Sequence, residues 1–66
     1  MSVEEVVERA GGRRAVALRL GITRQAVYQW IAQNEVPAAR VPALSALSGV
    51  PGEQIRPDLY AVAETN

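Results

Sequence analysis

Hydrogen-bonding side chains recur on one side of residues 24–31. With about 100° of rotation per residue in a helix, this polar side spans roughly 140° and contains Arg24, Gln25, Tyr28 and Gln29. The opposite side is wholly apolar and contains Ala26, Val27, Trp30 and Ile31. No acidic residue lies on the polar side. We expect a helix that is held by a core through its apolar side and that contacts the major groove of DNA through the other.

The charges are unevenly distributed along the chain, although the formal net charge is zero. No acidic residue lies between Glu8 and Glu35, and this interval contains five arginines: Arg9, Arg13, Arg14, Arg19 and Arg24. Because phosphate binding responds to the local electric field, this basic block favours a nucleic-acid partner. The alternative is an arginine-rich surface that is only solvated, and the charges alone do not decide between the two.

Length and composition limit the classes of function. Sixty-six residues make one domain, residues 1–66, in which we expect an ordered core at residues 2–60 and a loose tail at residues 61–66. The absence of cysteine and histidine excludes disulfides, the common zinc sites and catalysis by Ser-His or Cys-His pairs. Because there is also no convergent carboxylate pair, we predict that the protein is not an enzyme and has no catalytic residue, metal or cofactor.

Targeting and membrane segments are not recognisable in the sequence. No stretch has the features of a signal peptide, and no apolar run approaches the roughly 20 residues of a membrane span. We therefore expect a cytoplasmic protein whose partner is neither a membrane nor a small molecule.

Helical spacing and capping residues predict an all-α fold of four to five helices. The predicted helices cover about residues 3–10, 13–20, 24–33 and 39 or 40 to 48, with one further turn at 51–55 and an extended segment at 56–60. Ser2 and Glu5 have the spacing of a capping box at the start of the first helix. Pro42 is compatible only with the first turn of the fourth helix.

The segment that joins the second and third helices carries the most specific signal. Gly21 suits the left-handed conformation at the end of a helix, and Thr23 is a favoured N-cap that starts the next helix at Arg24. Ala17 is small enough to let the two helices approach closely, and Ile22 fills the turn between them. Each feature is common, but their combination at this spacing predicts two closely crossing helices.

Residues 13–31 are similar to the helix-turn-helix of the phage Cro and repressor superfamily, with matching positions at Ala17, Gly21, Val27 and Trp30. A likeness to the YdaS-like branch of Cro proteins, which includes phage Cro repressors and antitoxin candidates, rests on three segments: QAVYQW, VPAARV and IRPDLY. The resemblance covers about residues 11–60. It implies a compact lambda-repressor-like domain with a central helix-turn-helix that binds a palindromic operator in double-stranded DNA as a dimer.

Base contacts are implied for the first residues of the second helix of the motif. The matching positions are Arg24 and Gln25, with Gln29 one turn later. Arginine suits a bidentate contact to guanine, and glutamine suits one to adenine. Tyr28 lies on the same side, where its hydroxyl would donate to a phosphate or its ring would contact a thymine methyl group. The alternative for Tyr28 is that it folds back over the edge of the core.

Phosphate contacts are implied for the residue that opens the first helix of the motif. This position holds Arg13, with Arg14 beside it. Thr23 is a further phosphate candidate, because it precedes the positive N-terminus of the next helix.

Two apolar features do not fit a monomeric DNA-binding domain. Leu18 points away from the apolar side of its helix, so it is either partly exposed or covered by another element. The segment 55–62, with the apolar residues Leu59, Tyr60 and Val62, either lies back on the first and fourth helices and completes the core or forms a contact with a dimer partner. We favour the first alternative for Leu59 and leave Tyr60 open.

These observations predict a sequence-specific transcriptional regulator of the Cro-like phage or prophage kind, which represses by occluding a promoter. Its homodimer forms in solution or only on DNA. The alternative is an antitoxin-like or adaptor module with the same fold that contacts a protein through its C-terminal segment. Zero net charge and the apolar segment favour the alternative, whereas the basic block and the polar helix side disfavour it. Binding that weakens steeply with salt would indicate phosphate contacts.

Overall fold

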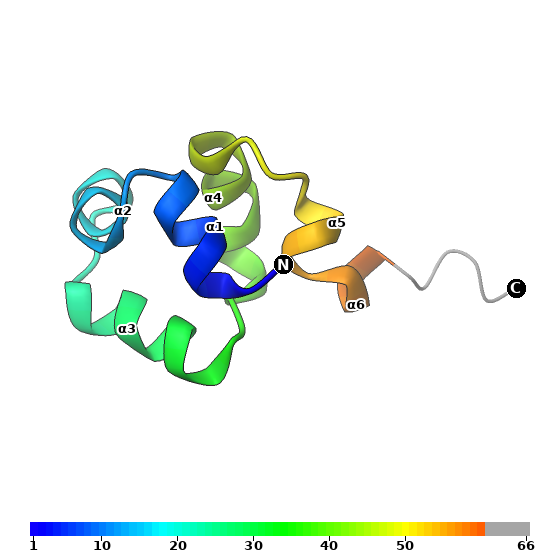
Figure 1. The fold of residues 1–66 in the computed structure, drawn as a ribbon, viewed down its shortest axis with the longest axis horizontal. Helices are drawn as coiled ribbons and strands as arrows, with labels where there is room; N and C mark the ends of the chain where they lie inside the picture. Colours follow the sequence, from blue (N-terminus) through cyan, green and yellow to red (C-terminus); the bar gives the residue numbers. More distant parts are fainter. Residues whose placement is uncertain (61–66) are drawn as a thin grey trace, which may run out of the picture.

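The computed structural model describes residues 1–60, and their regular elements are all helices (Figure 1). In chain order these are α1 (Val3–Arg9), α2 (Arg13–Leu20), α3 (Arg24–Gln33), the 3-10 turn η1 (Ala38–Arg40), α4 (Val41–Ser48), α5 (Gly52–Ile55) and α6 (Pro57–Tyr60). The predicted all-α class is therefore confirmed. None of these helices is long and apolar enough to cross a lipid bilayer. The predicted loose tail, residues 61–66, and the apolar residue Val62 within it lie outside the described residues.

Local capping explains where the first three helices begin and end. The Ser2 hydroxyl accepts a hydrogen bond from the Glu5 amide at 3.2 Å, and the Thr23 hydroxyl accepts one from the Ala26 amide at 3.1 Å. Gly21 ends α2 in the left-handed conformation, with φ 69° and ψ 34°. As a result α2 and α3 have the predicted bounds, and α1 ends one residue earlier than expected.

Residues Pro57–Tyr60 form the helix α6, so the prediction of an extended segment at residues 56–60 is wrong. The residue before a proline is disfavoured in helices, and Arg56 is accordingly non-helical, with φ −135° and ψ 76°. Pro57 itself has a φ that suits the first position of a helix and lacks an N–H that this position leaves unpaired. Asp58 adds a carboxylate to the first turn, near the positive end of the helix. The proline therefore starts α6.

The predicted fourth helix is divided into two parts. Residues Ala38–Arg40 form the 3-10 turn η1, and the α-helix begins one residue later than the latest predicted start. Pro42 lies in the first turn of α4, as expected, and the left-handed Gly49 (φ 76°) ends this helix.

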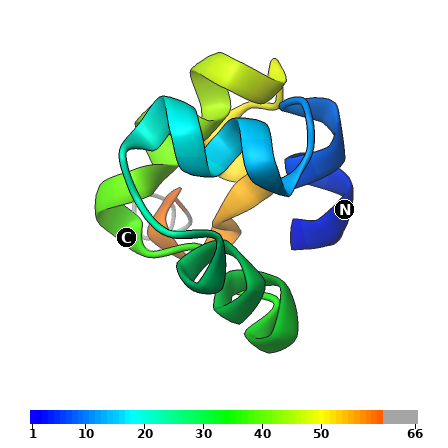
Figure 2. The same ribbon diagram turned by 90° about the vertical axis from the view of Figure 1, so that its left-hand side faces the viewer.

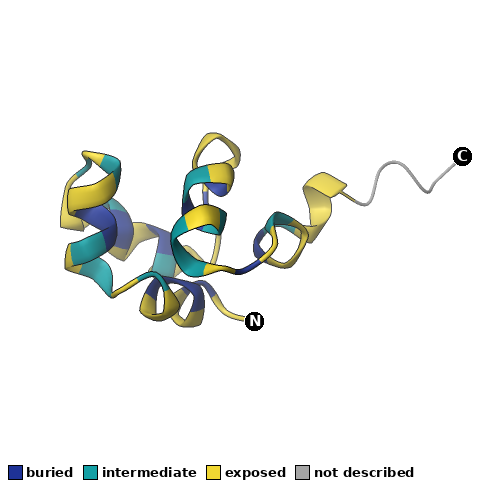
Figure 3. Cartoon of the chain, turned by 90° about the horizontal axis from the view of Figure 1, so that it is seen from above, coloured by how far each residue is buried: buried dark blue, intermediate teal, exposed yellow. Residues whose placement is uncertain are grey.

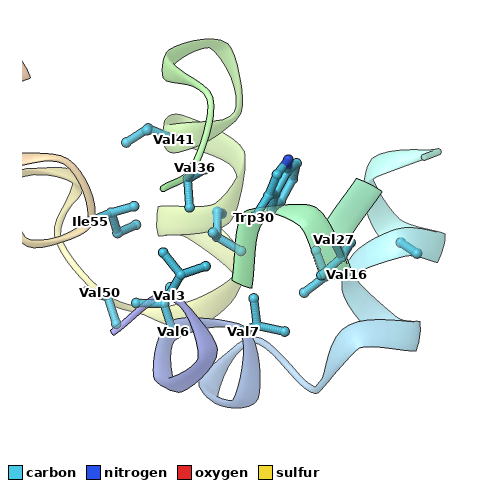
Figure 4. Close-up of a cluster of buried hydrophobic side chains, with 12 residues drawn as sticks. Val3, Val6, Val7, Val16, Val27, Trp30, Val36, Val41, Val50 and Ile55 are labelled. Atoms are coloured by element: carbon cyan, nitrogen blue, oxygen red, sulfur yellow. The ribbon is translucent and has the colours of Figure 1, made fainter. Parts of the chain in front are cut away.

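The core consists mainly of valine side chains from α1 to α5 (Figure 4). Its members are Val3, Val6, Val7, Val16, Ala17, Val27, Trp30, Val36, Val41, Leu44, Val50 and Ile55. Valine has few rotamers, so it loses little side-chain entropy when it is buried. In contrast, α6 contributes no buried residue.

The helices are arranged so that the two ends of the molecule differ. At one end α2 packs against α3, and the end-on view shows the two helices crossing (Figure 2). In the middle α1 lies against α4, and α5 packs against α4. At the other end α6 packs against α5 and leads away from the core (Figures 1 and 3).

Candidate nucleic-acid interface

Helix α3 is fixed by its apolar side and exposes its polar side. Val27 is 0% exposed and Trp30 is 7% exposed, and both lie within the core (Figure 4). Four polar residues on the opposite side, which we call the recognition face, are all exposed: Arg24, Gln25, Tyr28 and Gln29. Tyr28 is 49% exposed, so it does not fold back over the core. The predicted division of this helix into a buried and a polar side is therefore correct.

The turn between α2 and α3 depends on backbone conformation. The amides of Gly21 and Ile22 both donate to the Ala17 carbonyl, the latter at 3.0 Å. A Cβ atom at Gly21 would meet no atom within 4 Å, so its positive φ, and not lack of space, requires glycine. Ala17 is 5% exposed and belongs to the core, and α2 packs against α3. This turn sets the position of α2 relative to the recognition face.

Arg13 and Tyr28 bring the two helices into contact at the edge of the recognition face. The guanidinium carbon of Arg13 lies over the Tyr28 ring, 5.0 Å from its centroid. This distance is within the range of a cation–π interaction. Arg14, the next residue of α2, is exposed. Two predicted phosphate-binding residues therefore lie on the helix that packs beside α3.

Thr23 has a structural role that leaves its proton available. Its oxygen accepts the hydrogen bond from the Ala26 amide, so the hydroxyl hydrogen remains free to donate. The N-terminus of α2 is preceded by Gly12, which offers no side-chain cap. A phosphate near either position would meet unpaired donors.

The arginines of the basic block have no carboxylate partner among residues 1–60. Within this part of the chain the ion pairs involve Arg56, which lies near Glu35 and Asp58. The positive charge beside the recognition face is therefore not neutralised by the described residues. Such a surface attracts a polyanion and repels another cationic surface.

The residues predicted to contact a partner lie far from the recognition face. Leu59 and Tyr60 belong to α6 at the other end of the molecule (Figures 1 and 3). Leu59 is 42% exposed and α6 packs mainly on α5, so the expectation that Leu59 lies back on α1 and α4 is wrong. The cause is the helical turn at Pro57, which directs the chain along α5 and away from the core.

Tyr60 and Leu18 are also exposed. The hydroxyl end of Tyr60 occupies the space that a side chain at Gly52 would fill, next to Val41, yet 48% of the residue is exposed. Leu18 is 72% exposed on α2, which selects the first of the two alternatives left open for it.

Besides the contact of Arg13 with Tyr28, two further long-range contacts were not predicted. The Asn34 carbonyl oxygen Oδ1 accepts a hydrogen bond from the Val3 amide at 2.9 Å, so the residue that ends α3 also caps α1. Asn34 has φ 56°, and asparagine is one of the few residues that tolerates this conformation. The sequence signalled the end of α3 but contained no indication of a partner 31 residues away.

The second of these contacts joins Arg56 to the Val36 carbonyl. Its Nε and Nη2 donate to the two carboxylate oxygens of Asp58 at 2.9 and 2.6 Å, and its Nη1 donates to the Val36 carbonyl at 2.7 Å. The hydrogen bonds between the Arg56 and Asp58 side chains raise the pKa of Arg56 and hold the pKa of Asp58 below its usual value. The spacing of Arg56, Pro57 and Asp58 was a local signal for this pair.

Comparison with known proteins identifies the family of this chain. No curated protein and no solved structure shows significant similarity to it. Residues 3–64, which include the helices α1 to α6 of the described part of the chain, match the family described as "Bacterial toxin YdaS". This match agrees with the YdaS-like branch suggested by the three sequence segments. The chain belongs to the bacterial toxin YdaS family.

Proposed function

We propose that the chain is a sequence-specific DNA-binding regulator of the Cro and repressor superfamily. The observation that carries this proposal is the exposure of four hydrogen-bonding side chains on α3 beside a set of arginines without carboxylate partners among residues 1–60. An α-helix fits the major groove, where polar side chains distinguish base pairs. The protein represses by occluding a promoter, and the proposal includes no enzymatic step, cofactor or metal.

Each residue of the interface has a role that suits its chemistry. Arg24 makes a bidentate contact to guanine, and Gln25 and Gln29 make contacts to adenine. Arg13 and Arg14 bind backbone phosphates from α2, and Thr23 donates its hydroxyl to a further phosphate. The phosphate contacts set the orientation of α3, and the base contacts select the sequence.

The operator is palindromic in this proposal because two copies of the chain bind it. One copy presents a single α3, which covers only a short half-site. Two half-sites separated by one helical turn or a multiple of it require a two-fold symmetric pair of chains. Leu59 and Tyr60 are the candidate residues for the contact between the copies, since both have large, exposed side chains with much hydrophobic surface.

The family description is compatible with this mechanism. A protein that occludes a promoter needed for growth is toxic to the cell that produces it. Growth arrest upon induced expression should then depend on Arg24, and Arg24→Ala should relieve it. Toxicity that persists in this variant at equal protein levels would point to a target other than DNA.

The test of the proposal is selection of binding sites from a pool of random duplexes by the purified chain at moderate salt. Enrichment of a two-fold symmetric site would support a dimeric operator-binding protein, and the half-site spacing would define the dimer. Enrichment of a single half-site would keep the base contacts and remove the dimer. Failure to enrich any sequence would contradict the proposal.

A second candidate function is a protein-interaction module of the antitoxin-like or adaptor kind. The specific observation in its favour is the exposed pair Leu59 and Tyr60 on α6, a helix that contributes nothing to the core. Salt dependence separates the two candidates, because phosphate contacts weaken steeply with added salt and an apolar interface does not. If Leu59→Ser abolished binding of a protein partner and left DNA binding unchanged, the second candidate function would be favoured.

A further inference from the structure

The cation of Arg13 is held by the ring of Tyr28. The distance of 5.0 Å from the guanidinium carbon to the ring centroid lies inside the roughly 6 Å within which an aromatic ring attracts a cation. The two residues belong to α2 and α3, so the contact spans the turn between these helices. It orders a flexible side chain at the edge of the recognition face.

This contact orients Arg13 without neutralising it. The ring carries no net charge, and the ion pairs within residues 1–60 are made by Arg56 and not by Arg13. Arg56 shows the contrasting case, because its donors are occupied by Asp58 and by a main-chain carbonyl. The Arg13 guanidinium therefore keeps both its charge and its N–H donors for a ligand. A phosphate group matches those donors, because two of its oxygens can accept a pair of parallel hydrogen bonds from a guanidinium.

We propose that Tyr28 is a positioning residue for the phosphate contact of Arg13 and not a base-contacting residue. This inference rests on the proposed DNA binding and revises the role predicted for Tyr28. An arginine that is already ordered loses less side-chain entropy when it binds phosphate. Tyr28 therefore increases the affinity for every DNA sequence through Arg13 and leaves the choice of base to Arg24, Gln25 and Gln29.

The principal test is a double-mutant cycle on the full chain. It uses Arg13→Ala, Tyr28→Leu and the double variant, with one duplex that carries the selected site and one of scrambled sequence. We expect Tyr28→Leu to weaken binding to both duplexes by roughly threefold to fivefold. In the Arg13→Ala background the same change should have no further effect. Additive losses would overturn the inference, because they would show that Tyr28 acts independently of Arg13.

A conservative variant separates the ring from the hydroxyl. Tyr28→Phe keeps the aromatic ring, so it should recover most of the affinity that Tyr28→Leu loses, with the salt dependence of the wild-type chain. A loss in Tyr28→Phe that is confined to the selected duplex would overturn the inference. In that case the hydroxyl would contact a base edge directly.

The geometry is measurable without DNA. In the folded wild-type chain the δ protons of Arg13 should show an upfield ring-current shift in the NMR spectrum. Tyr28→Phe should keep this shift and Tyr28→Leu should abolish it. Absence of the shift in the wild-type chain would overturn the stacked arrangement.

Failure of this inference is distinguishable from failure of the proposed function. If only the inference fails, Arg24→Ala still relaxes the sequence preference, while the coupling between Arg13 and Tyr28 is absent. If the wild-type chain binds no duplex, both the proposed function and this inference are overturned.

Discussion

The two ends of the molecule use arginine in opposite ways. At the α2–α3 end, Arg13 contacts the ring of Tyr28 and has no carboxylate partner among residues 1–60. At the α5–α6 end, Arg56 donates to Asp58 and to the Val36 carbonyl, and thereby ties α6 to the segment after α3. The first arginine keeps its charge for a ligand, and the second uses its donors within the fold. The partners of an arginine therefore indicate its role better than the number of arginines nearby.

The exposed surfaces of the two ends also differ in polarity. The α3 surface consists of arginine, glutamine and tyrosine side chains, whereas α6 exposes Leu59 and Tyr60. A polyanion fits the first surface and an apolar partner fits the second. The comparison predicts that a substitution at one end affects DNA binding and that one at the other end affects stability or association.

The largest effect is expected from Trp30→Ala, which removes the part of the core that supports the recognition face. Truncation of a buried aromatic residue costs about 3–5 kcal/mol of unfolding free energy, a large share of the stability of so small a domain. Urea unfolding followed by circular dichroism measures the loss. The control is Gln33→Ala, an exposed change in the same helix, which should stay within about 0.5 kcal/mol of the wild-type chain. Equal losses of unfolding free energy in both variants would show that Trp30 does not support α3 more than an exposed residue does.

A pair of matched arginine substitutions tests the comparison directly. Arg24→Ala should cost about 1–3 kcal/mol of binding free energy at the selected site and relax the preference at one base pair, with little change in stability. Arg56→Ala should lower the thermal midpoint and leave the DNA affinity of the folded chain unchanged. Fluorescence anisotropy and thermal melts measure the two quantities. Weaker DNA binding in the folded Arg56→Ala chain would remove the distinction between the ends.

The phosphate contact has its own signature. Arg13→Ala should weaken binding to all sequences alike and reduce the slope of log K against log salt by about 0.9. A titration of one selected and one scrambled duplex between low and moderate salt measures both effects. A loss limited to the selected duplex would assign Arg13 to a base and not to the backbone.

Substitutions at Asn34 test the hydrogen bond that joins the end of α3 to the start of α1. Asn34→Ala should cost about 1–2 kcal/mol of unfolding free energy, because it loses the hydrogen bond to the Val3 amide and is strained at positive φ. Asn34→Gly loses the same hydrogen bond without the strain, so its cost should be smaller. Urea unfolding of the two variants separates the terms, and equal costs would show that the backbone conformation is not limiting.

The smallest effect is the pH dependence that arises from Asp58. Hydrogen bonds from Arg56 hold the pKa of Asp58 in the folded chain below the ordinary value of 3.8. Ionised Asp58 therefore stabilises the fold above the unfolded pKa, and this contribution declines as the pH falls from 3.8 through the folded pKa. Thermal melts should show the largest difference between wild-type and Asp58→Asn chains near neutral pH and a vanishing one in acid. The difference should become smaller in the Arg56→Ala background, where only the interaction of Asp58 with the start of α6 remains.

Most helix boundaries could be predicted because their causes are local. The caps at Ser2 and Thr23 act on amides three residues later, and Gly21 and Gly49 act through their own φ angles. The error at residues 56–60 concerns a local signal too, since Pro57 suits the first position of a helix and starts α6 where an extended segment is expected from the sequence. The polar side of α3 followed from helical periodicity alone, while its contact with DNA stays a prediction.

The sequence by itself determined which residues cap the helices, which side of α3 is polar and which interval lacks acidic residues. These properties depend on residue types and on neighbours three or four positions away. Only the tertiary structure decided that Arg13 meets Tyr28, that Asn34 caps α1 and that Arg56 reaches Val36. Each of these contacts joins residues at least 15 positions apart, because the packing of helices around the core brings them together, and no local pattern encodes that distance.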